Sequence, residues 1–359
     1  MTSTRISHVQ AVEEALRGFF DERRQEAAAI APVCAEAVTD LESCVLRGGK
    51  RVRPVFAWLG WLGAGGEEHG ADAGPLRRVG AALELFHASA LIHDDVIDAS
   101  ATRRGAPAVQ VLYAGRHRSR CWNGNAELFG TGAAILLGDL AQNWADDLLH
   151  SSGLSARALA RVAPVWSAQR AEVLHGQLLD VTAEVRGAED IDTPLRVNEY
   201  KTASYTVARP LHIGAAVADA DPHLIAAYRA FGHDIGVAFQ LRDDLLGVFG
   251  APEETGKPSG DDLVQGKRTM LFALALKYAD EQDPDAAKFL RTRIGTPVDD
   301  DELATVRTVM TDVGAVDHIE RDITRRTERA LTALRTSTAT AYAKDELTRL
   351  AISATQRAS

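Results

Sequence analysis

The sequence predicts an all-α protein that forms one large helical bundle. Apolar residues recur at spacings of three and four almost throughout, as in Val79, Leu83, Phe86 and Ala90, which is the period of one helix face. Alternating runs of β-branched residues, which are typical of strands, are scarce. No Gly/Ser-rich or Pro-rich linker separates two halves of the chain, so we expect a single domain over residues 1–359.

Turn-forming residues interrupt this periodicity and set the limits of the expected helices. The interruptions fall at residues 63–74, 100–123, 187–194, 219–222 and 250–266. Between them we expect, in chain order, helices at about 30–47, 52–62, 76–98, 124–149, 155–184, 197–218, 222–249 and 268–280. Further helices follow residue 299, because Asp299, Asp300 and Asp301 stand where a helix start favours negative charge.

Composition and charge exclude several classes of protein. A formal net charge of -10, with Lys and Arg not gathered in one basic block, argues against nucleic-acid binding. Cys34, Cys44 and Cys121 lack the spacing of a zinc site or a disulfide framework, so we expect a reduced, cytoplasmic protein. Glu13 and Glu14 interrupt the N-terminal segment where a signal peptide is apolar, and no apolar run approaches the length of a transmembrane segment.

The most informative feature is the run Asp94-Asp95-Val96-Ile97-Asp98; its three aspartates are called the first acidic cluster below. Asp94 and Asp98 share a helix face, where two like charges without a counter-charge destabilise a helix by roughly 0.2–0.5 kcal/mol. The preceding stretch, AALELFHASALIH, is apolar enough to lie in the core, which raises the free energy of unpaired carboxylates. Clustered carboxylates suit Mg²⁺, which leaves most of its coordination positions to water and substrate phosphates. The cluster therefore predicts a magnesium site and diphosphate chemistry.

A second acidic pair, Asp243-Asp244 in FQLRDDLLG, also follows an apolar helical stretch. Gly247 stands four residues after Asp243, where a further carboxylate would share the helix face. Taken alone, this pair is equally compatible with metal binding and with a solvated helix surface. Asp146-Asp147 has no such context, and we interpret it as solvated surface.

Basic residues accompany both groups of aspartates. The segment GGKRVRP at 48–54 places three cations after two glycines, whose flexibility lets the backbone approach an anion closely. It is equally compatible with a helix-entry loop whose charges are solvated. Arg103 and Arg104 follow the first acidic cluster, and Lys257 and Lys267 follow the second acidic pair. Metal ions together with cations suit two diphosphate groups.

In chain order, the motifs GGKRVRP, DDVID with RRG, GQLLD, KTAS, FQLRDD and GKPSGDDLVQGKRT resemble those of the trans-isoprenyl diphosphate synthases, the polyprenyl synthetase family. The resemblance spans roughly residues 30–340 and is greatest to the geranylgeranyl and farnesyl diphosphate synthases. It implies an all-α homodimer with the isoprenoid synthase fold, whose two aspartate motifs face each other across the mouth of a central cavity. It also implies a Mg²⁺-dependent prenyltransferase that acts on isopentenyl diphosphate and an allylic diphosphate.

The resemblance further implies a role for each matching residue. The residues implied to bind isopentenyl diphosphate are Lys50, Arg53, His87 and Arg104. Those implied to hold the metal ions are Asp94, Asp98 and Asp243 directly, with Asp95 and Asp244 in support. Those implied to hold the allylic diphosphate are Arg103, Lys201 and Lys257, with Lys267 nearby. Those implied to face the developing carbocation are Thr202 and Gln240, and those implied to line the same cavity are Gln177 and Asp180.

Gly247 departs from the family pattern, because many members carry a third aspartate at this position. We expect activity to survive this change, since it affects water-mediated contacts rather than the direct metal ligand, and we leave open a weaker affinity for the metal. The implied reaction is a head-to-tail condensation, in which the allylic diphosphate ionises, the isopentenyl double bond attacks the cation and a proton is lost. No protein nucleophile is required.

Product length should depend on the apolar tunnel beside the helix that ends at Asp94. Ser89 and Ala90 are small residues near its mouth, and Phe86 lies eight residues before Asp94, roughly 12 Å along the helix, as a candidate floor. The alternative for Phe86 is an ordinary core aromatic. We expect geranylgeranyl diphosphate as the product, with farnesyl diphosphate or a longer chain as alternatives.

Two other functions remain open. A class I terpene cyclase also uses an Asp-rich motif and Mg²⁺, but its second motif, [ND]DxxSxxxE, is not found at 143–151 or 243–252. Such a cyclase also has no need of a second diphosphate site like GGKRVRP. A non-catalytic subunit of a heteromeric synthase would keep the fold but lack metal ligands or the clusters of cations. The main set is present here, and the conspicuous missing residue is the third aspartate, which Gly247 replaces.

Overall fold

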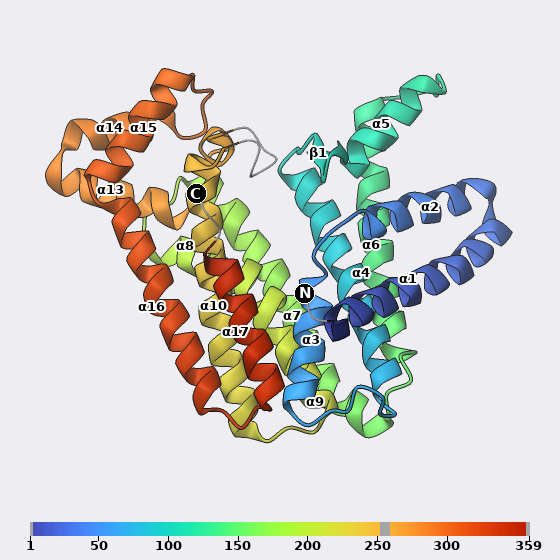
Figure 1. The fold of residues 1–359 in the computed structure, drawn as a ribbon. Helices are drawn as coiled ribbons and strands as arrows, with labels where there is room; N and C mark the ends of the chain where they lie inside the picture. The colour runs from blue at the N-terminus through green and yellow to red at the C-terminus, as the bar shows by residue number, and fades with distance from the viewer. Residues whose placement is uncertain (1–2, 252–258, 357–359) are drawn as a thin grey trace. The chain divides into compact units, whose positions relative to one another are not determined.

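The computed structural model describes residues 3–251 and 259–356, and the regular structure of these residues is helical apart from one two-stranded hairpin (Figure 1). The predicted all-α class is therefore confirmed. Backbone contacts divide the chain into two units: unit 1 is Met1–Ala163 with Ile213–Asp219, and unit 2 is Pro164–His212 with Ala220–Ser359. A single domain over the whole chain stays a prediction. None of the helices in the described ranges is long and apolar enough to cross a lipid bilayer.

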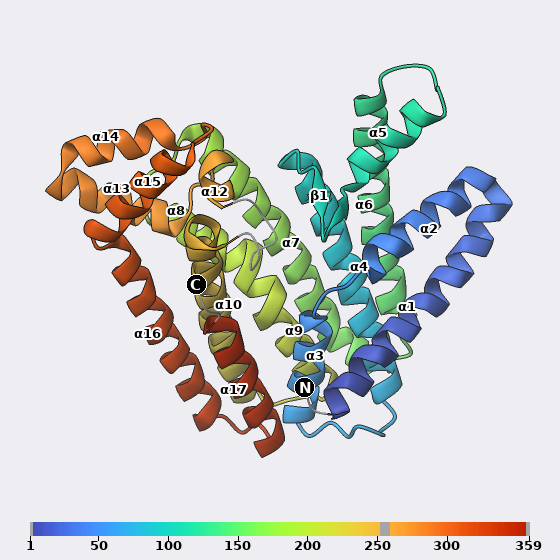
Figure 2. The same ribbon diagram turned by 45° about the horizontal axis from the view of Figure 1, so that its top comes forward.

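The helices of unit 1 are α1 Ser3–Ile30, α2 Pro32–Leu46, α3 Val52–Gly63, α4 Ala73–Ile97, α5 Val109–Ser119 and α6 Ala126–His150. Helix α2 has Pro32 in its first turn, where the missing N–H would have no partner within the helix in any case. Asn125 caps α6 by accepting a hydrogen bond from the backbone N–H of Leu128 at 2.8 Å. In Figures 1 and 2, α1 and α2 run side by side, and α4 lies along α6.

Helix α4 and the hairpin that follows it carry the first acidic cluster. Leu83 and Phe86 are buried along α4, as their spacing predicts, and Asp98 is the C-cap of the helix. Strand β1 (Thr102–Arg103) then pairs antiparallel with β2 (Ala106–Pro107). The two residues of the turn have positive φ, a geometry that matches the twist of hairpin strands. The hairpin places its arginines next to the end of α4.

The helices of unit 2 are α8 Asp192–Val197, α10 Pro222–Phe249, α12 Asp261–Val264, α13 Met270–Gln282, α14 Pro284–Arg293, α15 Asp300–Asp312, α16 Ala315–Thr336 and α17 Ala341–Thr355, with the π-helix η1 Asn198–Ala208. The boundary between the units falls inside α7 (Ala156–Arg186) and α9 (Arg209–Val217). Asp221 caps α10 by accepting hydrogen bonds from two backbone N–H groups. Asp299 and Glu302 form a capping box at the start of α15, which confirms the helix start predicted there.

The segment expected to be one α-helix over 197–218 is instead the π-helix η1 followed by α9. At the end of η1, the backbone N–H of Arg209 donates to the carbonyl oxygen of Ser204, five residues earlier. Helix α10 packs closely on η1, because a Cβ added to Gly236 would overlap the backbone of Ala203. The π-helix therefore coincides with close packing against α10. This contact joins residues far apart in the chain, so the local sequence pattern does not reveal it.

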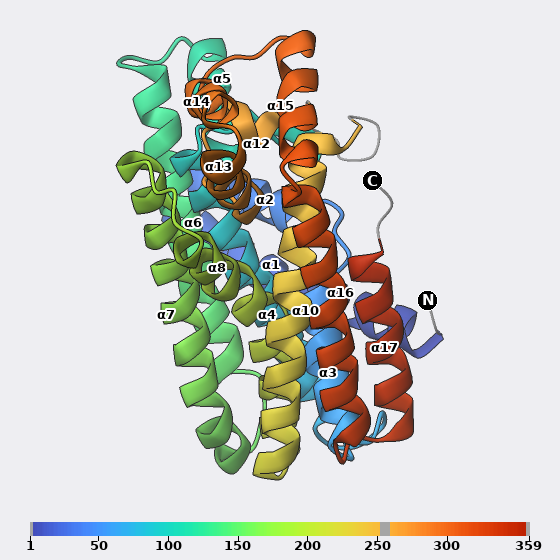
Figure 3. The same ribbon diagram turned by 90° about the vertical axis from the view of Figure 1, so that its left-hand side faces the viewer.

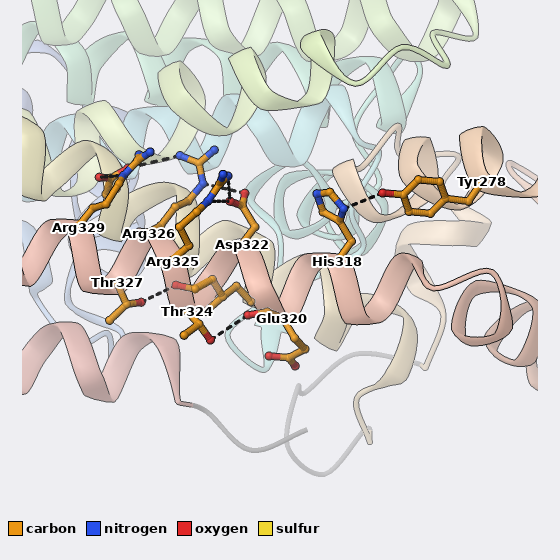
Figure 4. Close-up of polar contacts among 11 residues, drawn as sticks. Tyr278, His318, Glu320, Asp322, Thr324, Arg325, Arg326, Thr327 and Arg329 are labelled. Atoms are coloured by element: carbon orange, nitrogen blue, oxygen red, sulfur yellow. Dashed lines mark hydrogen bonds and ion pairs between the residues drawn. The ribbon is translucent and has the colours of Figure 1, made fainter.

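Helix α16 runs beside α10 (Figure 3), and polar contacts join it to its neighbours in unit 2 (Figure 4). The Arg326 Nε donates to Asp322 at 2.9 Å, and its Nη1 reaches Asp234 of α10 at 3.5 Å. The hydroxyl of Tyr278 on α13 and Nδ1 of His318 on α16 are hydrogen-bonded at 2.7 Å. Because Asp234 and Arg326 are both buried, these contacts fix the position of α16 along α10, the helix that carries the second acidic pair.

Five of the described helices, α1, α5, α8, α12 and α14, lie outside the expected ranges apart from a shared end residue. Helix α5 occupies part of 100–123, which we expected to be an interruption. Its buried side chains include Val109, Tyr113 and His117, which stand four residues apart on one face. Gly105 and Pro107 before this short helix, Gly115 within it and Gly124 after it obscured its period in the sequence.

Candidate active site

Unit 1 contains a cavity of about 200 Å³ beside the C-terminal half of α4. Four of the residues singled out in the sequence line it, namely His87, Asp95, Arg103 and Arg104. They come from α4 and from the hairpin that follows it, and the end of α2 closes another side. A cavity lined by several guanidinium groups suits an anion with many oxygen atoms, such as a diphosphate.

Arg103 provides the counter-charge that the first acidic cluster requires. Its Nε donates to Oδ1 of Asp95 at 2.9 Å, and its Nη2 bonds Asp95 as well and lies 3.3 Å from Oδ2 of Asp94. Burial raises the pKa of Asp95, and the hydrogen bond from Arg103 partly offsets that effect. Asp94 and Asp98 are half-buried and remain partly open to solvent. The structure thus brings the three aspartates and Arg103 together.

The glycine-rich segment before α3 adopts a backbone that few other sequences allow. Gly48, Gly49 and Arg51 all have positive φ, at 61°, 106° and 47°. The side chain of Arg51 turns inward, where its Nη1 donates to Oε2 of Glu84 at 2.8 Å. The side chains of Arg51 and Glu84 are 1% and 3% exposed, so this cation of GGKRVRP is part of the core.

The other predicted diphosphate ligands of unit 1 lie near the same turn. Arg104 donates from Nη1 to the carbonyl oxygen of Gly48 at 3.0 Å, Lys50 is exposed and Arg53 is buried. Burial and the positive charges of Arg53 and Arg104 hold the pKa of His87 well below its ordinary value. His87 is therefore neutral at pH 7 and offers a hydrogen bond rather than a positive charge.

Phe86, Ser89 and Ala90, the residues expected to set product length, follow one another along α4. Phe86 and Ser89 are 1% and 3% exposed, and Ala90 is half-buried. Their burial is compatible with a tunnel wall and with ordinary core packing. Their role in product length stays a prediction.

Unit 2 joins three of the predicted residues in one chain of hydrogen bonds. The hydroxyl of Thr202 on η1 donates to Oε1 of Gln240 on α10 at 2.9 Å. The Nε2 of Gln240 donates in turn to Oδ1 of Asp244 at 3.0 Å. On the other side of η1, Nζ of Lys201 lies 2.6 Å from Oδ2 of Asp180 on α7, which also belongs to the predicted set. The π-helix thus presents Lys201 and Thr202 to different neighbours.

The two carboxylates of the second acidic pair have different environments. Asp243 is exposed, whereas Asp244 is only 3% exposed. Burial raises the pKa of Asp244 to about 7, the hydrogen bond from Gln240 lowers it, and the negative charges of Asp262 and Asp243 raise it. The side chain of Asn198 also lowers this pKa, although Oδ2 of Asp244 makes no hydrogen bond of ordinary geometry to the described residues. A buried carboxylate oxygen without a partner costs free energy unless a cation or water satisfies it.

These donors fit Mg²⁺, which prefers oxygen ligands and keeps several positions for water and phosphate. Asp94, Asp95 and Asp98 of unit 1, and Asp243 and Asp244 of unit 2, offer only carboxylate oxygen atoms. Within residues 3–251 and 259–356, no three His, Cys, Asp or Glu side chains form a ready-made metal site. The arrangement suits an ion that arrives with a phosphate ligand rather than one held by the protein alone.

Asp244 should release a proton when Mg²⁺ and inorganic diphosphate bind. With a pKa of about 7, much of this carboxyl is protonated at neutral pH, and a metal ion favours its ionised form. The affinity for Mg²⁺ should therefore fall as the pH decreases below about 7. Calorimetry in buffers of different ionisation enthalpy measures the protons released, and Asp244→Asn should release fewer. Equal proton release by both proteins would contradict this assignment.

The same shift predicts how the metal-free protein responds to pH. Because the folded-state pKa of Asp244 lies above the unfolded value of 3.8, its contribution to stability is complete below that value and is lost as the pH rises through about 7. Asp244→Asn should be less sensitive to pH over this window in thermal unfolding. A mutant that loses stability as steeply as the original chain would show that other groups dominate.

The remaining predicted residues also fall in unit 2. Lys267 lies 3.6 Å from Asp262, measured from Nζ to Oδ1, and Gln177 is half-buried on α7. Lys257 lies outside the described residues. Sequence reasoning missed Asp262, although it stands in the quoted motif GKPSGDDLVQGKRT, because nothing in the local pattern distinguishes it from Asp261. It also gave no separate role to Arg51, whose burial only the three-dimensional contacts reveal.

Comparisons with known proteins cover most of the chain. The family model described as polyprenyl synthetase matches residues 36–311. The chain is 36% identical over 267 residues to a geranylgeranyl diphosphate synthase of Mycobacterium tuberculosis, which covers 74% of this chain and 70% of that protein. It is 33% identical over 286 residues to a geranylfarnesyl diphosphate synthase of Aeropyrum pernix, which covers 79% of this chain and 82% of that protein.

Solved structures are similar over nearly the whole length. The crystal structure of a geranylgeranyl pyrophosphate synthase from Corynebacterium glutamicum, complexed with isoprenyl diphosphate and magnesium, has a TM-score of 0.93 to this chain. The two sequences are 44% identical, and the match covers 98% of this chain and 99% of that one.

Proposed function

The chain belongs to the polyprenyl synthetase family, a family of trans-prenyltransferases, and from this premise we propose that it condenses isopentenyl diphosphate head-to-tail with an allylic diphosphate. The product is a short-chain, all-trans prenyl diphosphate, and the length we propose is geranylgeranyl. The observation that carries the proposal is that each unit places aspartates in the C-terminal part of a largely apolar helix, α4 in unit 1 and α10 in unit 2. One aspartate of each group, Asp95 and Asp244, is buried.

The described residues suit each step of this reaction. The allylic carbon–oxygen bond breaks, the isopentenyl double bond supplies the electrons of the new carbon–carbon bond, and a proton passes from the adjacent carbon to the released diphosphate. Mg²⁺, when bound, supplies positive charge that neutralises the leaving diphosphate. Arg103 and Lys201 add fixed positive charge, provided that they exchange Asp95 and Asp180 for phosphate oxygens.

Thr202 and Gln240 are suited to the carbocation. The Oε1 of Gln240 accepts from Thr202 while its Nε2 donates to Asp244, so the orientation of the amide is fixed from both ends. An oxygen atom held in place stabilises developing positive charge without reorganising during the reaction. In its ionised form, which a bound metal ion would favour, Asp244 would hold this amide more strongly.

The decisive test supplies the purified chain with Mg²⁺, radiolabelled isopentenyl diphosphate and one allylic primer at a time. Labelled geranylgeranyl diphosphate is the expected product. Hydrocarbon or alcohol released from an allylic diphosphate alone would indicate a terpene cyclase. Product formed only after a second protein is added would indicate a subunit of a heteromeric synthase.

Phe86→Ala should lengthen the product by at least one five-carbon unit. Removing the ring opens space about eight residues, or roughly 12 Å, along α4 from Asp94, at a cost in stability of about 3–5 kcal/mol. Chromatography of the dephosphorylated products measures the length. Leu85→Ala is the matched control, because Leu85 is also fully buried on α4 but is not in the expected wall. An unchanged product profile for Phe86→Ala would remove Phe86 as the floor.

We also propose that the enzyme is a homodimer. The α5–α6 segment of unit 1 exposes large apolar side chains, namely Val111, Leu112, Trp122, Leu128, Phe129, Ile135 and Leu136. Several exposed large apolar side chains on one segment are typical of an interface between proteins. Light scattering should give twice the chain mass of 38.6 kDa, and Leu128→Asp combined with Leu136→Asp should give the monomer. A cytoplasmic location stays a prediction.

A further inference from the structure

The carboxylate of Glu172, on the part of α7 that belongs to unit 2, receives three hydrogen bonds. Nε of Arg209 donates to its Oε2 at 2.9 Å, and Nη2 of Arg209 donates to its Oε1. The hydroxyl of Ser204 donates to Oε2 as well. Ser204 lies in η1 and Arg209 is the first residue of α9, so the carboxylate joins α7 to the end of the π-helix.

Ser204 and Arg209 are also the two ends of one wide turn. The backbone N–H of Arg209 donates to the carbonyl oxygen of Ser204, which is the five-residue hydrogen bond of a π-helix. In an α-helix, residues five apart point about 140° away from each other, because each residue turns the chain by about 100°. The wider turn brings the two side chains toward one side of the helix. The bonds to Glu172 therefore favour the π-helical winding over the α-helical one.

Three residues of α7 at four-residue spacing, Glu172, Gly176 and Asp180, share the helix face that contacts η1. Glu172 holds the end of η1, as described above. A Cβ added to Gly176 would collide with the backbone nitrogen of Lys201, so the two backbones are in close contact here. Asp180 accepts from Nζ of Lys201 at 2.6 Å. Helix α7 thus contacts η1 along its length, and Glu172 makes the contact farthest from Lys201.

The winding of η1 decides where Lys201 and Thr202 point. The side chain of Lys201 contacts α7, and that of Thr202 contacts α10. Shortly after η1, Leu211 of α9 is 0% exposed, so this end of the segment is fixed in the core. A change to α-helical winding in the last turn of η1 would therefore rotate the residues before it. Lys201 and Thr202 would then lose their contacts together.

The bridge between Glu172 and Arg209 is charged and only partly buried, since the two side chains are 21% and 13% exposed. Burial acts to raise the pKa of Glu172, but the hydrogen bonds from Arg209 and Ser204 outweigh it and leave this pKa below its ordinary value. The carboxylate is therefore ionised at neutral pH. All three side chains line a cavity of about 430 Å³. Replacing one of them leaves no hole in the apolar core, so we expect the variants below to fold.

We propose that Glu172 is a positioning residue for prenyl transfer: by holding Ser204 and Arg209 it keeps η1 in its π-helical winding, and so directs Lys201 and Thr202 at the allylic substrate. Glu172 acts only through η1 and touches no substrate itself. The inference rests on the proposed function, since only that function gives Lys201 and Thr202 an allylic diphosphate to act on.

Glu172→Gln removes the charge and keeps the shape of the side chain. We expect kcat to fall about 100-fold, because a small misplacement of a catalytic group has an effect of this size. KM for the allylic diphosphate should rise, because Lys201 is misdirected. KM for isopentenyl diphosphate should not change, because the residues implied to bind it lie in unit 1. Initial rates with each substrate varied in turn measure the three constants. A loss of folded protein alone would lower kcat and leave both KM values unchanged.

Glu302→Gln is the matched control. It makes the same substitution at a glutamate of unit 2 that pairs with an arginine, Arg293, at 2.8 Å, but on α15 rather than beside η1. Glutamine at this position can still complete the capping box with Asp299. The control should leave kcat and both KM values unchanged.

Two further measurements separate the role of the bridge from other effects. Hydrogen exchange reports on η1 without turnover: Glu172→Gln should speed the exchange of the backbone N–H groups of residues 198–209 and leave that of α6 unchanged. Arg209→Met breaks the same bridge from its other end. Combined with Glu172→Gln, it should lower kcat by no more than about threefold beyond the slower single variant, because residues that act as one unit are not additive.

Each outcome supports or overturns the proposal. Lower kcat with a higher KM for the allylic diphosphate alone, faster exchange in η1 and no further loss in the combined variant support it. Unchanged kinetics of Glu172→Gln overturn it, and so do two KM values that stay constant or change together, unchanged exchange in η1, or losses that multiply. If the original chain forms no product from the two diphosphates, the proposed function itself fails, and hydrogen exchange alone then decides whether Glu172 fixes the winding of η1.

Discussion

Asp94→Ala should lower kcat for prenyl transfer by about 10³-fold, equivalent to about 4 kcal/mol of barrier, while the chain stays folded. Asp94 is half-buried at the end of α4, and its carboxylate lies 3.3 Å from Nη2 of Arg103. The substitution removes one ligand of the proposed metal cluster, so positive charge no longer meets the leaving diphosphate. Arg103 keeps its partner Asp95, and for this reason we expect little loss of stability.

Initial rates at saturating Mg²⁺ and substrates, together with circular dichroism and thermal unfolding, measure both parts of this prediction. Asp147→Ala is the matched control, because Asp147 is an exposed aspartate of α6 to which the sequence assigns no role. It should leave the rate unchanged. A rate for Asp94→Ala within about tenfold of the original would exclude Asp94 as a metal ligand.

Arg51→Met should destabilise the fold by about 3–5 kcal/mol, because it leaves a buried carboxylate without its partner. The guanidinium of Arg51 donates to Glu84 at 2.8 Å and to the carbonyl oxygen of Val45 at 2.8 Å, and its Nε reaches Glu13 at 3.1 Å. These contacts tie α1, α2 and α4 to the start of α3. The free energy of unfolding in urea measures the loss.

Two further variants separate the buried ion pair from a general loss of charge. Arg118→Met removes a cation whose partner is Glu127, but both side chains are more than half exposed, so the change should stay within about 1 kcal/mol. Arg51→Met combined with Glu84→Leu should recover part of the loss, because no unpaired charge is then left in the core. Equal stability of Arg51→Met and the original chain would show that the pair contributes nothing.

Local patterns predicted the helices whose apolar faces and capping residues lie within the sequence itself. Helix α10 begins at Pro222 and ends at Phe249, where the sequence predicted it, and the box of Asp299 and Glu302 starts α15 as expected. Both rest on contacts a few residues apart. Helix α5 was missed because its short apolar period lies among turn-forming residues.

Some features of the candidate site could not be predicted, because they depend on contacts between residues far apart in the sequence. Motif order singled out Thr202, Gln240 and Asp244, and the structure joins them by hydrogen bonds, while their catalytic roles stay a prediction. It could not show that Arg51 turns inward, since the neighbouring cations of GGKRVRP have the same local context. Nor could it show that Asp262 lies against Gly247, because the two residues come from different helices.

The π-helix η1 makes this part of the enzyme sensitive to chain length. Lys201 near its start contacts Asp180, and Arg209 just after its end bonds Glu172, so α7 holds η1 on both sides of the wide turns. Deleting one residue between these anchors, with the winding of the helix unchanged, would rotate one anchor against the other by about a quarter turn. Lys201 and Arg209 could then no longer both reach α7, so natural relatives should tolerate substitutions here far more readily than a change in residue number.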